Sequence, residues 1–466
     1  MFYNAPMIQN TRLRLRRRRS LWSLIIVGTF LLLAVGVYFL PPVHSRLAWR
    51  LENLRTQIKY FFNPPEDVIF IPTGGAVSTS TPAMLPTLTA TLLPDVPTAV
   101  PTFTPTPLPA QVKLTGIVYS SQCNRWNYCG AANLAMALNY WGWDGDRDDV
   151  AMAIKPGEND PNKTFIDRGK TDYNIMPYEM VDFVNDSTEL NAISRYGGTP
   201  ELLKRMVAAG FPVVIEKGYY QRDSTGRTSW MGHFSFITGY DEESGAFIWQ
   251  DSYPNRCRDM ENPEVVERKG RDNIITSDDL LSAWQGFDYI FIIIYPTDRQ
   301  DDMFAALGPW GDETWASTHA LEIATQEISD LEGNEQFFAW FNRGTSHVAL
   351  FQYADAASAY DQSFAVYADL GDDDSERPYR ILWYQTGPYK AYYYSGRYQD
   401  VVDLADTTLD YLVATPSLEE SLYWRALAEY ALGQFDFAYA DMRLAVYYNQ
   451  NFTAAWNMMT EWGISP

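Results

Sequence analysis

The chain has 466 residues, of which 46% are hydrophobic and 15% aromatic, so it carries enough apolar side chains for more than one folded core. The net charge is −22, and residues 301–466 hold 26 acidic against 7 basic side chains, which argues against a phosphate backbone as ligand and hence against nucleic acid. The sequence has no G-x-x-x-x-G-K-[ST] loop, no H-E-x-x-H and no paired C-x-x-C, so no nucleotide, metal or other cofactor is expected.

The first forty residues have the pattern of a membrane anchor. Residues 1–20 include six arginines, and residues 21–40 carry no charged side chain. Twenty helical residues at about 1.5 Å each span a hydrocarbon core of about 30 Å. The positive-inside rule then predicts a cytoplasmic basic segment at 1–20, a transmembrane helix at 21–40, and a single-pass cell-membrane protein whose remainder is extracytoplasmic. A cleaved signal peptide is the alternative.

Two segments follow the predicted membrane helix. Residues 41–72 are expected to form a juxtamembrane helix and a connector, because apolar residues recur at spacings of three and four between 44 and 62. Residues 73–110 are rich in threonine and proline, with Asp95 as the single charge. Proline at this density favours an extended segment without a core, so we predict a stalk.

The pattern of residues changes at position 111, and the segment 111–297 contains the candidate catalytic residues. Residues 113–119 have a strand-like pattern, and the run from Cys129 is helix-like and stops at Gly142. Cys129 therefore lies where a loop enters a helix, and the backbone N–H groups there favour the thiolate that a nucleophilic cysteine needs. A cysteine in a helix is also often a small buried apolar residue, so Cys129 needs partners to be assigned as a nucleophile.

Two strand-like runs supply these partners. Residues 232–241 alternate as a strand that contains His233, and residues 246–254 form a second run that ends at Asp251 and a turn. If the two strands are antiparallel neighbours, His233 and Asp251 lie side by side.

Alternatives remain for both partners. Asp251 has a second interpretation as a turn residue, in which case Asp241 is the substitute acid. A core or surface position remains the alternative for His233. The other histidines lie outside this segment, at His44, His319 and His347.

These residues together resemble the papain-like cysteine peptidases of family thirty-nine, the bacteriocin-processing type and its relatives. The resemblance rests on Gln122, then Cys129-Gly130 opening a helix, then Gly-His-Phe on a strand, then an Asp-Ser-Tyr-Pro turn. It implies an α+β papain-like domain over 111–297. It also implies four roles: a nucleophile, a general base, an orienter of the imidazole and an oxyanion donor, which fall on Cys129, His233, Asp251 and Gln122.

The sequence departs from the family pattern at two points. Ala131 stands where the family often has proline, and Gln122 precedes Cys129 by seven residues, one more than is usual in papain-like enzymes. Gln122 therefore keeps the alternative of an ordinary loop residue. The bacteriocin-processing members are joined to a transporter with an ATPase, which this sequence lacks, so a double-glycine leader is not the expected substrate.

The two other cysteines flank the candidate site. Cys123 lies six residues before Cys129, and Cys257 lies six residues after Asp251, so a real triad places both on loops at one rim. Thiols outside the cytoplasm commonly pair, which makes a Cys123–Cys257 disulfide possible. Two free buried thiols are the alternative.

Residues 311–466 read as an all-α domain of repeats. An aromatic residue is followed three positions later by a short one at 353/356, 398/401 and 435/438, in segments that resemble tetratricopeptide repeats. Residues 312–331 are expected to add a capping helix. Helix pairs that contact only their neighbours predict a domain that folds alone. The tyrosines of this region can either form a core stripe or line a peptide-binding face (Tyr389, Tyr392, Tyr393 and Tyr394).

The sequence therefore predicts a membrane-anchored cysteine peptidase that cleaves peptide bonds through an acyl-enzyme, with helical repeats that recruit a protein substrate or partner. A transpeptidase or amidase reaction belongs to the same chemistry. The alternative from another class is an inactive peptidase-like scaffold at the cell surface.

Overall fold

The computed structural model describes residues 28–29, 36–38, 40, 43, 70–73, 107–123, 125, 127–156, 174–222, 228–257, 262–370, 377–378, 380–410 and 418–466. In these ranges no helix is long and apolar enough to cross a membrane. The predicted basic segment 1–20, most of the predicted membrane helix 21–40, the amphipathic helix at 44–62 and most of the predicted stalk lie outside them.

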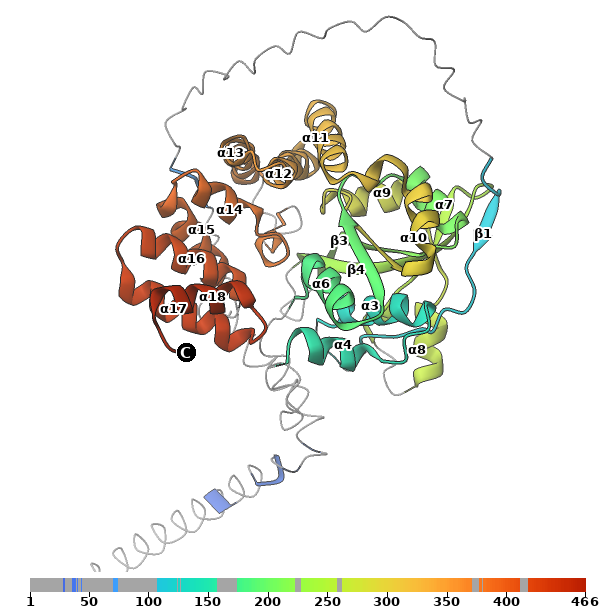
Figure 1. The fold of residues 1–466 in the computed structure, drawn as a ribbon, viewed down its shortest axis with the longest axis horizontal. Coiled ribbons are helices and arrows are strands. Elements are labelled where there is room, and N and C mark those ends of the chain that lie inside the picture. The colour runs from blue at the N-terminus through green and yellow to red at the C-terminus, as the bar shows by residue number, and fades with distance from the viewer. Residues whose placement is uncertain are drawn as a thin grey trace, which may run out of the picture. The chain divides into compact units, whose positions relative to one another are not determined.

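A seven-stranded antiparallel sheet forms the first part of the described chain (Figure 1). Its main path runs β2-β7-β3-β4-β5-β6, and β1 pairs with β4. The strands are β1 (Gln111–Lys113), β2 (Leu190–Arg195), β3 (Val213–Arg222), β4 (Thr228–Asp241), β5 (Ala246–Gln250), β6 (Asn273–Thr276) and β7 (Phe291–Pro296). The strand predicted at 113–119 ends at Lys113 instead, and Gly116, with φ at +81°, interrupts the extended run.

Helices cover both faces of the sheet. One face carries α3 (Cys129–Tyr140), α4 (Arg147–Ile154) and α6 (Pro177–Ser187), and the other carries α7 (Pro200–Ala208), α9 (Ser277–Gln285) and α10 (Gln300–Leu307). The interior strand β7 explains the arrangement, because Phe291 and Ile293 pack into one core while Ile292 and Ile294 pack into the other. Shorter elements are η1 (Pro254–Cys257), α8 (Pro263–Gly270), η2 (Thr297–Arg299) and η3 (Gly308–Gly311). The domain is therefore a mixed α/β fold.

The rest of the chain is helical, coloured orange to red in Figure 1. Its helices are α11 (Glu313–Asp330), α12 (Gly333–Ala349), α13 (Tyr353–Asp369), η4 (Ile381–Trp383), α14 (Gly387–Tyr394), α15 (Tyr398–Asp410), α16 (Glu419–Ala431), α17 (Phe435–Tyr448) and α18 (Thr453–Trp462). Helix α11 lies where a capping helix was predicted and packs on α12.

The aromatic-to-short spacing marks equivalent positions in three helix pairs. Tyr353, Tyr398 and Phe435 are each the first residue of the second helix of a pair, namely α13, α15 and α17. The short residues three positions later are fully buried in the packing between helices: Ala356, Val401 and Ala438. The repeated aromatic-to-short spacing in the sequence thus corresponds to repeated helix pairs.

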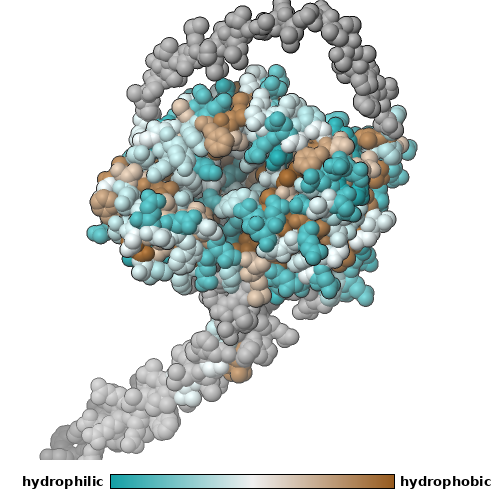
Figure 2. Space-filling model, viewed as in Figure 1, coloured by the Kyte–Doolittle hydropathy of each residue, from teal (hydrophilic) through white to brown (hydrophobic). Residues whose placement is uncertain are grey.

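The tyrosines of α14 divide between core and surface. Tyr389 and Tyr392 are completely buried, which agrees with a core stripe, whereas Tyr394 is 55% exposed. Farther along, α17 exposes Phe437 and Tyr447. On the face shown in Figure 2, hydrophilic side chains predominate over the described part of the chain, with apolar side chains in small groups among them.

Residues on both sides of the predicted boundary at 297–311 contribute to common cores. Residues 65–163 and 167–466 form one compact unit. Met303 and Trp310 are buried in the core beneath the sheet, and Trp310 Nε1 donates to the carbonyl of Gly197 at 2.9 Å. In the other direction, the core of the helical region includes Trp230 and Phe287 from the sheet domain. The shared core argues against the expectation that residues 311–466 fold alone.

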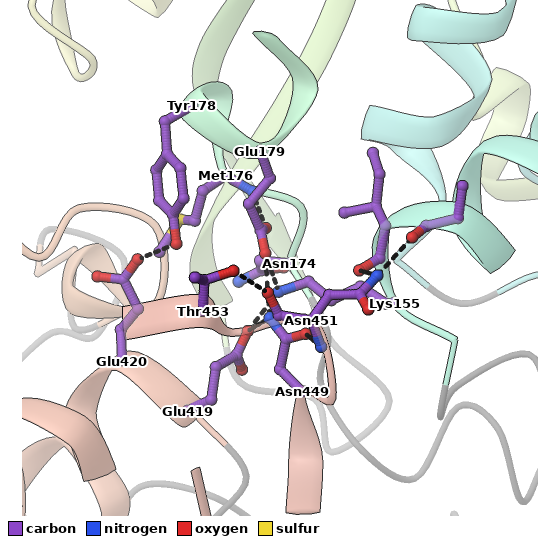
Figure 3. Close-up of polar contacts among 12 residues, drawn as sticks. Lys155, Asn174, Met176, Tyr178, Glu179, Glu419, Glu420, Asn449, Asn451 and Thr453 are labelled. Atoms are coloured by element: carbon purple, nitrogen blue, oxygen red, sulfur yellow. Dashed lines mark hydrogen bonds and ion pairs between the residues drawn. The ribbon is translucent and has the colours of Figure 1, made fainter. Parts of the chain in front are cut away.

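A buried polar group also connects the two regions (Figure 3). Lys155, which ends α4, forms an ion pair with Glu179 of α6 at 2.9 Å and a second with Glu419 of α16. The amide of Asn449 donates to both carboxylates, at 3.1 and 3.2 Å. We call these residues the Lys155 cluster; they are Lys155, Glu179, Glu419 and Asn449.

The residues where the predicted connector meets the predicted stalk lie on the helical region. The Phe70 ring is buried and packs edge-on against Phe364 at 5.0 Å. The backbone N–H and hydroxyl of Thr73 both donate to the Asp400 carboxylate, at 3.0 and 2.5 Å. The predicted connector therefore ends in a docked segment, which the sequence did not indicate.

Candidate active site

Cys129 is the first residue of α3. The loop before it turns at Asn127, which has φ at +54°, and the helix then runs along the sheet with residues 130–138 buried. The backbone N–H groups of Gly130 and Phe234 lie close enough to the Cys129 sulfur to lower its pKa. Asn133, one helical turn later, donates to the carbonyls of Cys129 and Phe234, both at 2.9 Å, and so ties the start of the helix to β4.

His233 and Asp251 come together from neighbouring strands. Phe236 on β4 pairs with Gln250 on β5, so Asp251 lies one step beyond the end of β5, on the same face and diagonal to His233. His233 Nε2 lies 3.1 Å from Asp251 Oδ1, and the same oxygen accepts the Tyr253 N–H at 2.9 Å. The imidazole also lies close enough to the Cys129 thiol for each group to shift the pKa of the other. The structure thus brings Cys129, His233 and Asp251 into one chain of contacts.

The ionised forms of Cys129, His233 and Asp251 stabilise one another. Burial raises the pKa of Cys129, but the hydrogen bond and charge of His233 outweigh it and hold this pKa below its usual value. Burial lowers the pKa of His233, yet its bonds to Asp251 and Cys129 raise it to about 9. Burial works against ionised Asp251 too, and the imidazolium keeps its pKa below the ordinary range. All three directions favour a thiolate–imidazolium pair with a carboxylate behind it.

Gln122 lies beside this group. Its Oε1 accepts the Ser252 hydroxyl at 3.2 Å, and its backbone N–H donates to the Ser252 carbonyl at 2.7 Å. Asn133 Nδ2 in turn donates to the same hydroxyl at 3.2 Å. Because Oε1 is occupied by Ser252, the amide is oriented and its Nε2 is the group left to donate to a substrate oxygen.

A disulfide joins the loops of Gln122 and Asp251. Cys123 and Cys257 are bonded, with their Cα atoms 5.3 Å apart, and Tyr119, Tyr253 and Val266 pack around them. Cys129 is the single free cysteine of the chain.

The alternative residues lie elsewhere. Asp241 accepts the N–H of Glu243 at 2.9 Å in the turn after β4. His319 stacks on Trp315 and His347 bonds Gln352, both in the helical region, while His44 falls outside the described residues.

Four further residues shape the site and were not predicted. Asn133 and Ser252 hold Gln122 and the helix start, as described above. Glu216, the cross-strand partner of Phe234, is buried, and burial together with the nearby Cys129 charge raises its pKa well above its ordinary value, so it is a neutral carboxyl. Lys217, opposite His233, lies over the Trp249 ring at 3.9 Å. A polar residue four positions after Cys129 was a readable signal for Asn133, whereas Glu216 and Lys217 become neighbours only through strand pairing.

Comparison with known proteins finds a family that is similar to this region. Residues 110–268 match the family described as Peptidase_C39 like. Among solved structures, a protein of Bacillus anthracis described as a C39-like peptidase matches at 19% identity with a TM-score of 0.29, covering 40% of this chain and 96% of its own. No curated protein matches. The family match does not extend into the helical region. Residues 110–268 are thus similar to the C39-like peptidases.

Proposed function

We propose that this protein is a membrane-anchored, extracytoplasmic cysteine peptidase that uses Cys129, His233 and Asp251 as a catalytic triad. The observation that carries the proposal is the contact chain from the start of α3 through His233 to Asp251, in which all three pKa shifts favour the ion pair. Anchoring rests on residues 1–40, and the disulfide agrees with an oxidising compartment.

The reaction follows from the protons that these groups hold. The Cys129 thiolate attacks the carbonyl carbon of a peptide bond, and negative charge develops on the carbonyl oxygen. Gln122 Nε2 and the backbone N–H groups at the helix start are the donors for that oxygen. The His233 imidazolium then gives its proton to the leaving amine, which leaves an acyl-enzyme. The neutral imidazole next takes a proton from water, the resulting hydroxide attacks the thioester, and the thiolate departs.

The nucleophile and the base can be tested separately from folding. Iodoacetamide should alkylate Cys129 rapidly well below the ordinary thiol pKa of about 8.5, and His233→Ala should remove this low-pH reactivity. Cys129→Ala should abolish turnover of a peptide library. Turnover above about 10% of wild type in either variant, with the circular dichroism spectrum unchanged, contradicts the assignment. Product analysis with an added amine separates hydrolysis from transpeptidation.

For the helical region we propose a tetratricopeptide-like surface that binds the protein substrate or a protein partner. Three equivalent helix pairs and an excess of acidic side chains support it, and a basic, extended segment fits that charge. Tyr394 is exposed and its ring lies 4.6 Å from Tyr353. Tyr394→Ala should raise the KM for a basic protein substrate and leave a short peptide unaffected. An equal effect on both substrates contradicts the role.

A further inference from the structure

The part of β4 that precedes His233 is enclosed by aromatic rings from the helical region. Trp230 is 2% exposed. Its ring stacks on Phe287 at 5.2 Å, and it contacts Phe338 of α12 at 5.5 Å and Tyr384 at 5.7 Å. Tyr384 follows η4, the short helix between two of the helix pairs. The strand that carries the candidate base thus packs against two elements of the helical region.

Tyr384 packs directly on the backbone next to His233. A Cβ atom placed on Gly232 would lie 2.7 Å from the Tyr384 ring and 2.8 Å from Phe287. The cross-strand partner of Gly232 is Gly218, where a Cβ atom would lie 2.4 Å from Trp230 Nε1. Two paired glycines therefore let the rings approach the strands closely, one residue before the imidazole.

The segment that holds Tyr384 also reaches the cysteine side of the site. Gln385 Nε2 donates to the carbonyl of Gly286 at 2.6 Å, and the carbonyl of Trp383 accepts Asn174 Nδ2 at 2.8 Å. Asn174 is followed by Ile175, whose Cβ lies 3.1 Å from where Gly130 would carry a Cβ. Gly130 is the neighbour of Cys129. One segment, residues 380–385, is thus connected to both ends of the Cys129–His233 contact.

From these contacts we infer that Tyr384 is a positioning residue for His233, and that residues 380–385 of the helical region hold the cysteine and histidine at reacting distance. The inference rests on the proposed function of the Cys129–His233 pair. It gives the helical region a role in the chemistry of every substrate, short peptides included, besides any role in recruitment. Loss of the Tyr384 ring would let β4 shift and would weaken the hydrogen bond between His233 and Cys129.

The test compares the full chain with Tyr384→Ala, Tyr384→Phe and the control Tyr423→Ala. Tyr423 also packs between rings of the helical region, 5.3 Å from Trp424 and 5.1 Å from Phe452. The rate of Cys129 alkylation by iodoacetamide is measured from pH 5 to 10, together with thermal unfolding. Without a positioned imidazolium the thiol returns toward its ordinary pKa of about 8.5, so Tyr384→Ala should react about tenfold or more slowly at pH 6.5. Tyr384→Phe and Tyr423→Ala should keep the wild-type profile, even where Tyr423→Ala lowers Tm.

The outcomes separate the possibilities. A wild-type profile in Tyr384→Ala overturns the positioning role and leaves the proposed function intact. An ordinary thiol profile in the wild-type protein overturns the proposed function itself. An equal loss in Tyr423→Ala shows that general destabilisation is the cause and also overturns the inference. If Tyr384→Ala does not fold, Tyr384→Leu, which keeps an apolar group over Gly232, is judged by the same profile.

Discussion

This protein contains two buried groups of ionisable side chains, and they differ in whether a proton can move between their members. The Cys129–His233–Asp251 chain leaves the Asp251 side chain 21% exposed, whereas the side chains of Lys155, Glu179 and Glu419 are 2%, 10% and 8% exposed. In the first group a thiol and an imidazole share one proton. In the second, a lysine is saturated by two carboxylates. Buried charge is therefore not by itself a sign of catalysis; a transferable proton and an accessible side are needed as well.

The pKa shifts express the same difference. Burial would lower the pKa of Lys155, but Glu179 and Glu419 raise it above its ordinary value, so the ammonium stays charged at every relevant pH. Burial and the neighbouring Glu419 raise the pKa of Glu179 to about 7, against the effect of Lys155. Lys155 thus serves as a fixed cation between α4, α6 and α16, and the cluster contributes to packing rather than to proton transfer.

The largest effect is expected from Asp251→Asn. Without the carboxylate the imidazolium loses its partner, so kcat should fall about a hundredfold or more while the unfolding transition changes little. Asp241→Asn is the matched control, because Asp241 is the last residue of β4, the strand that carries His233, and caps a turn. Steady-state kinetics on a peptide substrate decide it: similar kcat values for the two variants contradict the role of Asp251.

Lys155→Met should destabilise the fold strongly. At pH 8 it leaves two buried carboxylates without a cation, which costs about 3–5 kcal/mol. At pH 5 the loss should be smaller, because the pKa of Glu179 is raised to about 7 and this side chain is then neutral. Lys204→Met is the control, since Lys204 pairs with Glu242, which is 43% exposed, and should cost less than about 1 kcal/mol. Denaturant unfolding at both pH values measures the difference, and equal losses for the two lysines contradict a structural role for the cluster.

Removing the disulfide should have an intermediate effect. The Cys123→Ser/Cys257→Ser variant loses a link that spans 134 residues, and a loss of about 2–4 kcal/mol is typical for such a bond. The loop of Gln122 should also move relative to that of Asp251, so kcat should fall by less than in Asp251→Asn. Thiol counting on the denatured, unreduced wild-type protein gives the check on the bond itself: one free thiol is expected, and three reject it.

The smallest effect is a change in the pH dependence of stability. Folded Glu179 keeps its proton up to a pKa of about 7, whereas an unfolded glutamate releases it near 4.5. The folded state therefore binds more protons between these values, and the free energy of unfolding falls as pH rises from 4.5 to 7. Glu179→Gln should flatten this window. The Cys129–His233 pair should add little slope between 6.5 and 9, because the pKa of His233 is raised while that of Cys129 is lowered, so the folded and unfolded states bind similar numbers of protons. If Glu179→Gln leaves the pH dependence of the free energy of unfolding unchanged below pH 7, the raised pKa of Glu179 is contradicted.

Much of the candidate site could be predicted because its signals are local. A helix that begins at Cys129 and two strands joined by a short turn are visible in the sequence, and antiparallel pairing then brings His233 beside Asp251. Glu216 and Lys217 were not predicted because no residue near them in the sequence indicates that they lie close to Cys129. They enter the site through the pairing of β3 with β4, which residue spacing does not encode.

The helical region shows the same limit at a larger scale. The aromatic-to-short spacing indicated where the second helix of each pair begins. Ala356 and Val401 must be small at that point for the two helices to approach. The spacing gives no sign that Trp230 and Phe287 belong to the same core. The predicted boundary after residue 297 therefore rests only on a change in amino-acid composition. Burial shared between segments distant in the chain is what a pattern within one segment cannot reveal.

The docking of Phe70 and Thr73 changes what the proline- and threonine-rich segment can do. Phe70, just before it, and Thr73, its first residue, lie on α13 and α15, and the residues that follow it enter β1. Because both flanking ends lie on the compact unit that contains Cys129, the number of residues between them affects the entropy of chain closure. Doubling that length costs only about 0.6 kcal/mol of closure entropy. A change in the length of this segment should therefore alter the free energy of unfolding only slightly.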